Sequence, residues 1–373
     1  MATGRAPAMY AIPQRVSLVA QTVASLRQGL AAGLWHEHLP GELELCERLQ
    51  VSRMTLRRAL AVLEGEGLLV TAQGQRRRIG KAAPAGPARR ERRVVLLTPL
   101  RLAEMRPTVL YWVNDLTDHL AEAGFHLEVH PCSACYAERP EETLNRLERE
   151  LRPAGWVLYL STAAMQEWFS RQTVPALLAG SRHGDVRLPS VDLDYRAIGQ
   201  HAAETFLAKG HRHLAFLRSA HGLAGDLETE HGFVEACGRH GARGEAIDLG
   251  ETAERVAQTV GQRLARAPRP TALLVSQPAH LLTVLGTLAQ AGVAVPGDVS
   301  LISRDSESFL PFVVPTVARY EIAPANLARN LSRQVLLMLG PRGRADRAVR
   351  LMPKFVPGAT LGNLSKARTT TPA

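Results

Sequence analysis

From residue 94 onward, the sequence alternates short apolar runs with stretches long enough for helices. The runs are VVLLT, FHLEV, WVLYL, PALLA, HLAFL, TALLV and VSLIS, and the stretches between them include 195–209, 252–266 and 278–291. Repeated strand–helix alternation favours parallel sheets that are covered by helices on both faces. Residues 94–363 are more than a minimal doubly wound sheet needs, so we expect an α/β domain with two lobes and parallel sheets.

The first 80 residues follow a different pattern. Residues 15–33 and 42–49 carry apolar side chains at helical spacing, and Ser52 is placed to cap a third helix over 53–64. The next segment, LLVTAQGQRRRIG, has two short apolar runs around a Gln-Gly-Gln turn, which predicts a β-hairpin. Three helices followed by a hairpin are the layout of a winged helix-turn-helix domain, which we place at 11–80.

Two segments without apolar periodicity mark the other boundaries. Residues 81–93 (KAAPAGPARRERR) are rich in Pro, Gly, Ala and Arg, which is typical of a linker. Residues 364–373 predict a disordered tail. The two-lobed domain is therefore expected at 94–363.

Positive charge is concentrated at the front of the chain. Residues 1–93 contain 15 Arg or Lys and 7 Asp or Glu, so most of the formal net charge of +10 lies there. A basic segment on a nearly neutral body favours a polyanionic partner, although a solvated basic surface gives the same count. The sequence shows no signal peptide, no apolar run of membrane-spanning length and only four cysteines, so we expect a cytoplasmic protein with no membrane partner.

The third predicted helix has the residue types that DNA recognition requires. One face carries leucines, and the other is basic and polar, which suits a helix in the major groove with its N-terminal end toward the bases and phosphates. The predicted DNA contacts are Ser52, Arg53, Met54, Thr55, Arg57 and Arg58 on this helix, and Gln73, Gly74, Gln75, Arg76 and Arg77 on the hairpin. An ordinary charged helix face, or a winged helix that binds protein, would look similar.

The segment LPGELELCERLQVSRMTLRRALAVLEGEGLL resembles the winged-helix domain of GntR-type regulators. The matching residues are Pro40-Gly41, Val51-Ser52-Arg53, Thr55, Arg57, Ala59-Leu60, Leu63-Glu64 and Gly67-Leu68. The hairpin departs from the family, which usually has Gly-x-Gly-Thr where this chain has Gly74-Gln75-Arg76-Arg77. The resemblance implies double-stranded DNA as a partner, with a palindromic operator that is read by a homodimer.

Three later segments are similar to the sugar-binding domain of LacI/GalR-type regulators, which is related to periplasmic binding proteins. They are VDLDYRAIGQHAAETFLAKGHRHLAFLRS (191–219), ETEHGFVEACGRHG (228–241) and PTALLVSQPAHLLTVLGTLAQAGVAVPGDVSLISRDS (270–306). The resemblance implies an effector, most simply a sugar, in a cleft at the carboxyl ends of the strands. It also implies a repressor of carbohydrate-utilisation genes whose affinity for its operator responds to that effector.

The effector-binding residues are predicted by their positions after strands and in these segments. They are Asp305, Gln277, Thr229, Thr98, Gly180 and Trp112. Asp305 would accept hydrogen bonds from sugar hydroxyls, and Gln277 would both donate and accept. The family usually has Arg where Thr229 stands and Asn-Asp where Gln277-Pro278 stand. A non-sugar effector, or a domain that binds no effector, is therefore an alternative.

A fused enzyme is the remote alternative, because GntR-type winged helices also occur joined to aminotransferase-like domains. Such domains need a cofactor-binding lysine, and none of Lys81, Lys209, Lys354 and Lys366 lies in a convincing active-site setting. The sequence has neither Gly-x-Ser-x-Gly nor a Walker loop. Cys132-x-x-Cys135 has no second cysteine pair to complete a structural zinc site. We therefore expect no enzyme activity, no cofactor and no metal.

Overall fold

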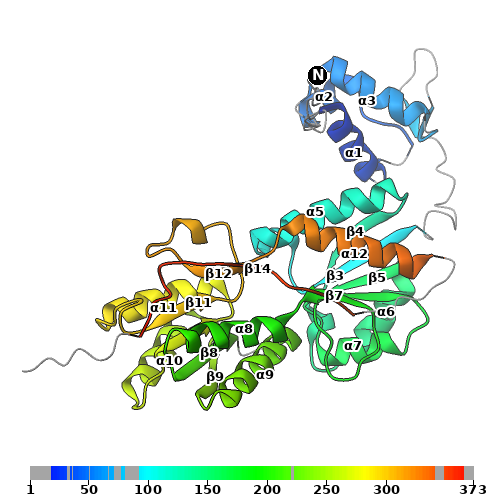
Figure 1. Ribbon diagram of the computed structural model, residues 1–373. Helices are drawn as coiled ribbons and strands as arrows, with labels where there is room; N and C mark the ends of the chain where they lie inside the picture. The colour runs from blue at the N-terminus through cyan, green and yellow to red at the C-terminus, as the bar shows by residue number, and fades with distance from the viewer. Residues whose placement is uncertain are drawn as a thin grey trace, which may run out of the picture. The chain divides into compact units, whose positions relative to one another are not determined.

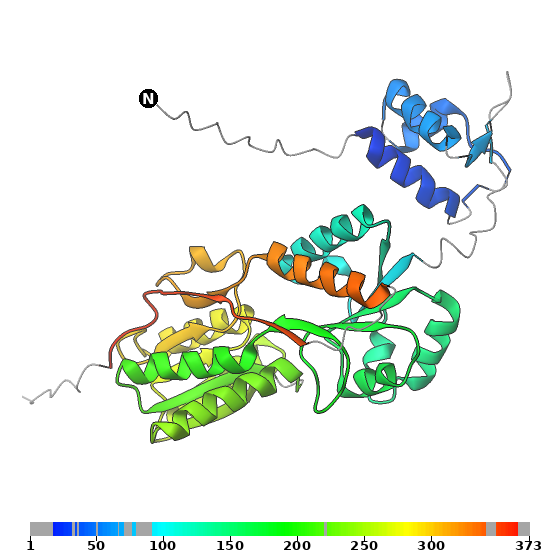
Figure 2. The same ribbon diagram turned by 45° about the vertical axis from the view of Figure 1, so that its right-hand side comes forward.

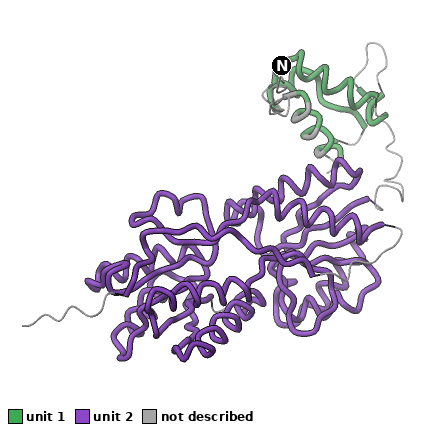
Figure 3. The backbone as a smooth tube through the Cα atoms, viewed as in Figure 1, with its two compact units in different colours: residues 1–89 green, residues 90–373 purple. Residues whose placement is uncertain are grey.

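The computed structural model describes residues 18–31, 34–35, 37–49, 51–65, 67–70, 77–79, 92–219, 222–340 and 348–364. The chain divides into two compact units, residues 1–89 and residues 90–373 (Figure 3). The predicted linker and tail lie outside the described residues except for Arg92, Arg93 and Leu364. Arg93 is the first residue of a strand.

In its described part, the first unit has three helices followed by a two-stranded antiparallel sheet. The elements are α1 (Leu18–Ala31), α2 (Glu42–Leu49), α3 (Arg53–Gly65), β1 (Leu69–Val70) and β2 (Arg78–Ile79). Leu69 pairs with Ile79 and Val70 with Arg78, so the predicted hairpin is confirmed. Apolar side chains from the helices and the hairpin form one core that contains Val23, Leu26, Leu39, Leu45, Leu56, Ala59, Leu60, Leu63 and Leu69. Each fully buried leucine contributes about 1.5–3 kcal/mol to the stability of this core.

The second unit has two lobes, each built on a six-stranded sheet in the described part of the chain (Figure 1). The first-lobe sheet has the order β13-β7-β6-β5-β3-β4, and its strand pairs are parallel. Its strands are β3 (Arg93–Thr98), β4 (His126–Pro131), β5 (Gly155–Tyr159), β6 (Ala176–Ala179), β7 (Ser190–Leu193) and β13 (Ala348–Leu351). Its helices are α5 (Pro107–Glu122), α6 (Glu141–Leu151), α7 (Ala163–Ser170) and α12 (Pro324–Leu339), with short 3-10 turns at Leu102–Glu104 and Ser133–Tyr136.

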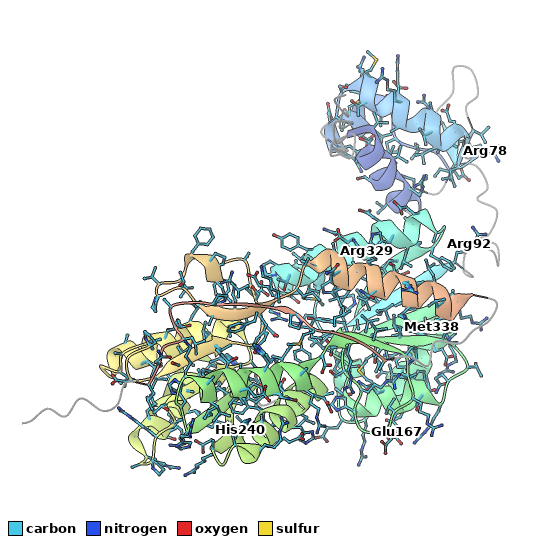
Figure 4. The ribbon with its side chains drawn as sticks, in the orientation of Figure 1. Arg78, Arg92, Glu167, His240, Arg329 and Met338 are labelled. Atoms are coloured by element: carbon cyan, nitrogen blue, oxygen red, sulfur yellow. The ribbon has the colours of Figure 1, made fainter. Side chains whose placement is uncertain are left out.

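Both faces of the first-lobe sheet are covered, as its continuous apolar strands predict. Val94 and Leu96 of β3 lie in the core with α5 and α12, whereas Val95 and Leu97 lie in the core with α6 and α7. Helix α12 lies beside α5 in both ribbon views (Figures 1 and 2). On α12, Met338 is buried in this core and Arg329 is exposed to solvent (Figure 4).

The second-lobe sheet has the order β14-β12-β11-β10-β8-β9, and β14 runs antiparallel to β12 at one edge. Its strands are β8 (His213–Ser219), β9 (Arg243–Leu249), β10 (Ala272–Val275), β11 (Ser300–Ser303), β12 (Ala318–Glu321) and β14 (Lys354–Val356). Helices α8 (Tyr195–Ala208) and α9 (Ala224–Arg239) cover one face, and α10 (Ala253–Ala265) and α11 (Pro278–Gln290) cover the other. A short 3-10 turn spans Leu310–Phe312. The predicted α/β class with parallel sheets in two lobes is confirmed.

Two glycines bring α8 and α9 into direct backbone contact. A Cβ atom on Gly199 would lie 2.2 Å from the carbonyl oxygen of Thr229, and one on Gly232 would lie 2.0 Å from that of Arg196. No side chain fits at either distance, so the close approach of the two helices requires glycine at both positions. This contact fixes the N-terminal half of α9, where Asp226 and Thr229 face the rest of the lobe.

The two lobes are joined by more than one connection. Within the described residues, the chain passes between them after β7, after β12 and again between β13 and β14. Neither lobe is therefore a continuous segment of the sequence. The first two crossings lie at the carboxyl ends of β7 and β12, and the residues there face the space between the lobes.

Candidate functional site

The start of α3 presents the predicted recognition residues to solvent. The Ser52 hydroxyl accepts a hydrogen bond from the Thr55 backbone N–H at 3.2 Å, and the two hydroxyls lie 2.9 Å apart. This cap fixes the first turn of α3, where Arg53 and Met54 are exposed. Arg57 and Arg58 are also exposed, because Leu56, Ala59, Leu60 and Leu63 turn the opposite face of α3 into the core. The exposed side chains of Arg53, Met54, Arg57 and Arg58 therefore lie on the face of α3 that points away from the core.

Arg77 has a different environment from the residues of α3. Its guanidinium donates to Glu42 at 2.8 Å and to Glu64 at 2.6 Å, and its side chain is 22% exposed. Glu42 also accepts a hydrogen bond from Arg57 at 2.9 Å, and the hydrogen bonds from Arg77 and Arg57 lower the pKa of its carboxyl group. Arg77 thus ties the base of the hairpin to α2 and α3. The other predicted hairpin contacts, Gln73, Gly74, Gln75 and Arg76, lie outside the described residues.

A cavity of about 580 Å³, which we call the cleft, lies between the lobes of the second unit at the carboxyl ends of their strands. Of the predicted effector-binding residues, Asp305, Gly180 and Trp112 line the cleft. Thr98, Thr229 and Gln277 are not among its lining residues. The Thr98 hydroxyl donates to the Leu100 carbonyl at 2.9 Å, that of Thr229 donates to the Gly225 carbonyl at 2.7 Å, and Gln277 is the N-cap residue of α11.

Arg304 organises the second-lobe wall of the cleft. It follows β11, and its side chain, 6% exposed, pairs with Asp226 and lies 3.4 Å from Asp305. It also donates to the Thr229 hydroxyl at 3.3 Å. Its guanidinium stands 4.5 Å from the centre of the Tyr195 ring, a distance typical of a cation–π contact. A positive charge therefore lies beside Thr229, where the resembling family usually carries an arginine.

Residues of the first lobe reach across the cleft to the second. Arg106, which precedes α5, lies 3.4 Å from Asp305 and 3.6 Å from Glu307. The Thr108 hydroxyl donates to Glu307 at 2.8 Å. Opposite charges at this separation attract, so these contacts favour a closed arrangement of the two lobes.

Aromatic rings form much of the remaining wall. The rings of Trp112 and Tyr159 meet edge to face with their centres 5.6 Å apart, and Tyr195 and Tyr320 also line the cleft. Burial raises the pKa of the Tyr159 and Tyr195 hydroxyls, so both rings carry a neutral O–H. Flat apolar faces beside polar groups are suited to a small ligand that is polar at its edges.

Several lining residues were missed by the sequence analysis, namely Arg106, Tyr159, Asp192, Tyr195, Arg304 and Glu307. Some signals were present. Tyr159 ends an apolar run, Arg106 precedes a proline that begins a helix, and Asp192 lies in the segment VDLDY. Glu307 had no comparable signal, because it lies in an irregular loop after β11.

Within the described residues, His, Cys, Asp and Glu side chains form no group of three that would hold a metal ion. The Cys132 and Cys135 sulfurs lie 2.6 Å apart in the turn after β4. No helix in the described part of the chain is long and apolar enough to cross a membrane.

Comparison with known proteins agrees with this geometry. Residues 18–79 match the family model of bacterial regulatory proteins of the gntR family, and residues 203–361 match the model of a periplasmic binding protein-like domain. An arabinose metabolism transcriptional repressor from Geobacillus stearothermophilus is 24% identical over 288 residues, which are 73% of this chain and 77% of that protein.

Solved structures show the same fold. A LacI family transcriptional regulator from Enterococcus faecium with bound ribose aligns with a TM-score of 0.60 and 17% identity, over 73% of this chain and 99% of that one. The transcriptional regulator CelR in complex with cellobiose aligns with a TM-score of 0.63 and 18% identity, over 83% of this chain and 92% of that one. This chain therefore carries a GntR-type helix-turn-helix domain followed by a two-lobed periplasmic-binding-protein-like domain of the LacI fold.

Proposed function

We propose that this protein is a sequence-specific DNA-binding transcription regulator, and a repressor of carbohydrate-utilisation genes. The observation that carries the proposal is the presence, in one chain, of an exposed basic helix α3 in a GntR-type domain and a cleft at the carboxyl ends of two sheets. The first feature fits duplex DNA and the second fits a small effector. The similarity to a repressor of arabinose metabolism supports a sugar as that effector.

Arg53, Arg57 and Arg58 are the proposed base and phosphate contacts, with Ser52, Met54 and Thr55 beside them. One α3 helix covers only a few base pairs, which gives too little discrimination within a genome. Two copies related by a two-fold axis would read two half-sites. The proposal therefore includes a homodimer on a palindromic operator, in the cytoplasm, where such a site is accessible.

The cleft supplies a way to couple the effector to DNA. Arg106 and Thr108 of the first lobe hold Asp305 and Glu307 of the second lobe directly at the place where a ligand would lie. A ligand that binds one arrangement of the lobes better than another shifts the population toward it. Coupling between such sites is commonly about 1–3 kcal/mol, so we expect operator affinity to change by about five- to 150-fold when the effector binds.

The test is a selection from genomic DNA. Purified full-length protein is incubated with sheared DNA from its source at low and at physiological salt, and the retained fragments are sequenced. The proposal predicts a small set of palindromic sites that remain bound at physiological salt, next to genes for carbohydrate use. Diffuse binding that salt removes would contradict it, because that result requires phosphate attraction alone.

A further inference from the structure

The cleft contains more negative than positive charge. Its lining includes the carboxylates of Asp192, Asp226, Asp305, Glu307 and Glu321 and the guanidinium groups of Arg106 and Arg304. One more guanidinium, that of Arg319, binds Glu321 at 2.7 Å. Among the described residues, the lining thus holds five carboxylates and two guanidinium groups, and Arg319 beside the lining pairs with Glu321.

Glu307 holds one part of this excess. Its side chain is 4% exposed. One carboxylate oxygen accepts the Thr108 hydroxyl at 2.8 Å and lies 3.6 Å from Arg106, whereas the other, Oε2, has no hydrogen-bond partner among the described residues. A buried carboxylate oxygen without a donor is unfavourable by about 1–3 kcal/mol or more. A ligand that brings a donor to Oε2 would remove this cost.

Asp192 contributes a second negative charge to the cleft. Its oxygens accept hydrogen bonds from the Ser181 hydroxyl at 2.6 Å and from the Leu193 backbone N–H at 2.8 Å, which are neutral donors. Arg350 lies opposite Asp192 in the register of β13 and β7, but Asp192 has no ion pair within 4.0 Å among the described residues. Asp192 lies close enough to Asp305 and Arg304 for their charges to affect its ionisation. Glu307 and Asp192 line the same cleft, so their carboxylates act on one ligand.

The polar residue types that line the cleft also bear on the chemistry of the ligand. Among the described residues, the lining contains no Asn, Gln, His or Lys. The groups that can both donate and accept there are hydroxyls of Ser, Thr and Tyr, whereas the carboxylates only accept. Carboxylates next to the rings of Trp112 and Tyr159 favour a cation, whereas the Tyr195 ring already carries the Arg304 guanidinium.

We infer that the effector carries a positively charged amine, which donates to Oε2 of Glu307 and is stabilised by the charges of Asp305 and Asp192. This inference rests on the proposed function and specifies the chemistry of its effector. An amine supplies a hydrogen-bond donor for Oε2 of Glu307 and a positive charge that offsets the excess of carboxylates in the cleft. An amino sugar and a short aliphatic diamine share this chemistry, and the two are separated by experiment.

The test compares ligands that differ only in the amine. Melting temperatures of the full-length protein are measured with glucosamine and glucose, with galactosamine and galactose, with N-acetylglucosamine, and with 1,4-diaminobutane. The inference predicts that an amine raises the melting temperature and that its neutral counterpart does not. A response to 1,4-diaminobutane alone would identify a diamine, and a response to an amino sugar alone would identify that class. The inference is overturned if a neutral sugar has the larger effect, or if no amine in the panel has any.

Variants locate the site. Glu307→Gln keeps the shape of the side chain and removes its charge, so the affinity for the responding amine should fall at least about tenfold, equivalent to about 1.4 kcal/mol. Glu150→Gln, on the exposed face of α6, is the matched control and should bind the amine as the wild type does. If Glu307→Gln folds, as judged by circular dichroism, and binds the amine with unchanged affinity, the assignment is wrong. Asp192→Asn is a second probe, for which a smaller loss is expected.

Failure of this inference is separable from failure of the proposed function. A protein that retains palindromic sites and responds only to neutral sugars remains a regulator, and its effector has no amine. A protein that binds the amine through Glu307 and retains no specific DNA is not the proposed regulator.

Discussion

The exposed face of α3 and the wall of the cleft carry opposite charges, and the two sets of charged side chains are stabilised in different ways. The arginines at the start of α3 are exposed to water, where charge costs little whether or not it is paired, so one short segment suffices to display them. The carboxylates of the cleft lie between two lobes, and each depends on donors from other segments: Glu307 on Thr108, Asp226 on Arg304, Asp192 on Ser181. A local surface is thus encoded by consecutive residues, whereas a buried site is encoded by the whole fold.

The largest expected effect tests whether the second unit depends on contacts between distant segments. Gly232→Ala forces a Cβ against the Arg196 carbonyl and should lower the free energy of unfolding of this unit by about 3 kcal/mol, because α8 and α9 must separate. Gly238→Ala on the same helix has no atom within 4 Å of the added Cβ and should change stability by less than about 1 kcal/mol. Denaturant unfolding followed by circular dichroism distinguishes them, and equal effects would refute the argument.

The next effect concerns the surface of α3. Arg53→Glu replaces attraction for DNA by repulsion at the predicted recognition end, and it should weaken binding to a selected operator by about 100-fold or more. Arg333→Glu makes the same change in charge at an exposed position of α12, which belongs to the second unit. This variant should change the affinity for the operator by less than about threefold. Fluorescence anisotropy with a labelled operator measures both. Equal losses would mean that net charge, not α3, determines the affinity.

A smaller effect concerns a carboxylate of the cleft. Burial raises the pKa of Asp192 from its ordinary value to about 6, with Arg304 lowering it and Asp305 raising it. The folded state therefore holds this proton more tightly than the unfolded chain does, and stability falls as the pH rises from about 4 through 6. Asp192→Asn should raise the free energy of unfolding by about 1–2 kcal/mol at pH 7 and leave it nearly unchanged at pH 4. A gain of the same size at both pH values would count against this cause.

The smallest effect has the opposite sign and lies in the first unit. Hydrogen bonds from Arg77 and Arg57 lower the pKa of Glu42, so its contribution is present at neutral pH and is lost as the pH falls through the folded-state value. Glu42→Gln should reduce stability by about 1 kcal/mol at pH 7, and less at pH 3. Glu44→Gln, which affects only an exposed i,i+4 pair with Arg48, is the control. Thermal unfolding at the two pH values tests the prediction.

The same contrast explains which residues the sequence could predict. The recognition face followed from the leucine spacing of one helix, and Asp305, Gly180 and Trp112 followed from strand ends and a helix that begins beside them. Thr98 occupies the equivalent strand end in β3, but its hydroxyl turns back to Leu100 and does not reach the cleft. Glu307 was missed because its role depends on Thr108 and Arg106, about 200 positions away in the sequence. No pattern within one segment carries that information.

The repeated passage of the chain between the lobes has a consequence for the order in which the protein is synthesised. The helices and hairpin that hold α3 are complete once residue 79 has been added. Both sheets of the second unit, by contrast, are incomplete until the strands that follow α12 have been synthesised, namely β13 in the first lobe and β14 in the second. Because domains fold as units during synthesis, starting from the N-terminus, the growing chain acquires its basic DNA-facing helix before either wall of the cleft is finished. A nascent chain released before residue 356 would carry that helix without a finished sensor.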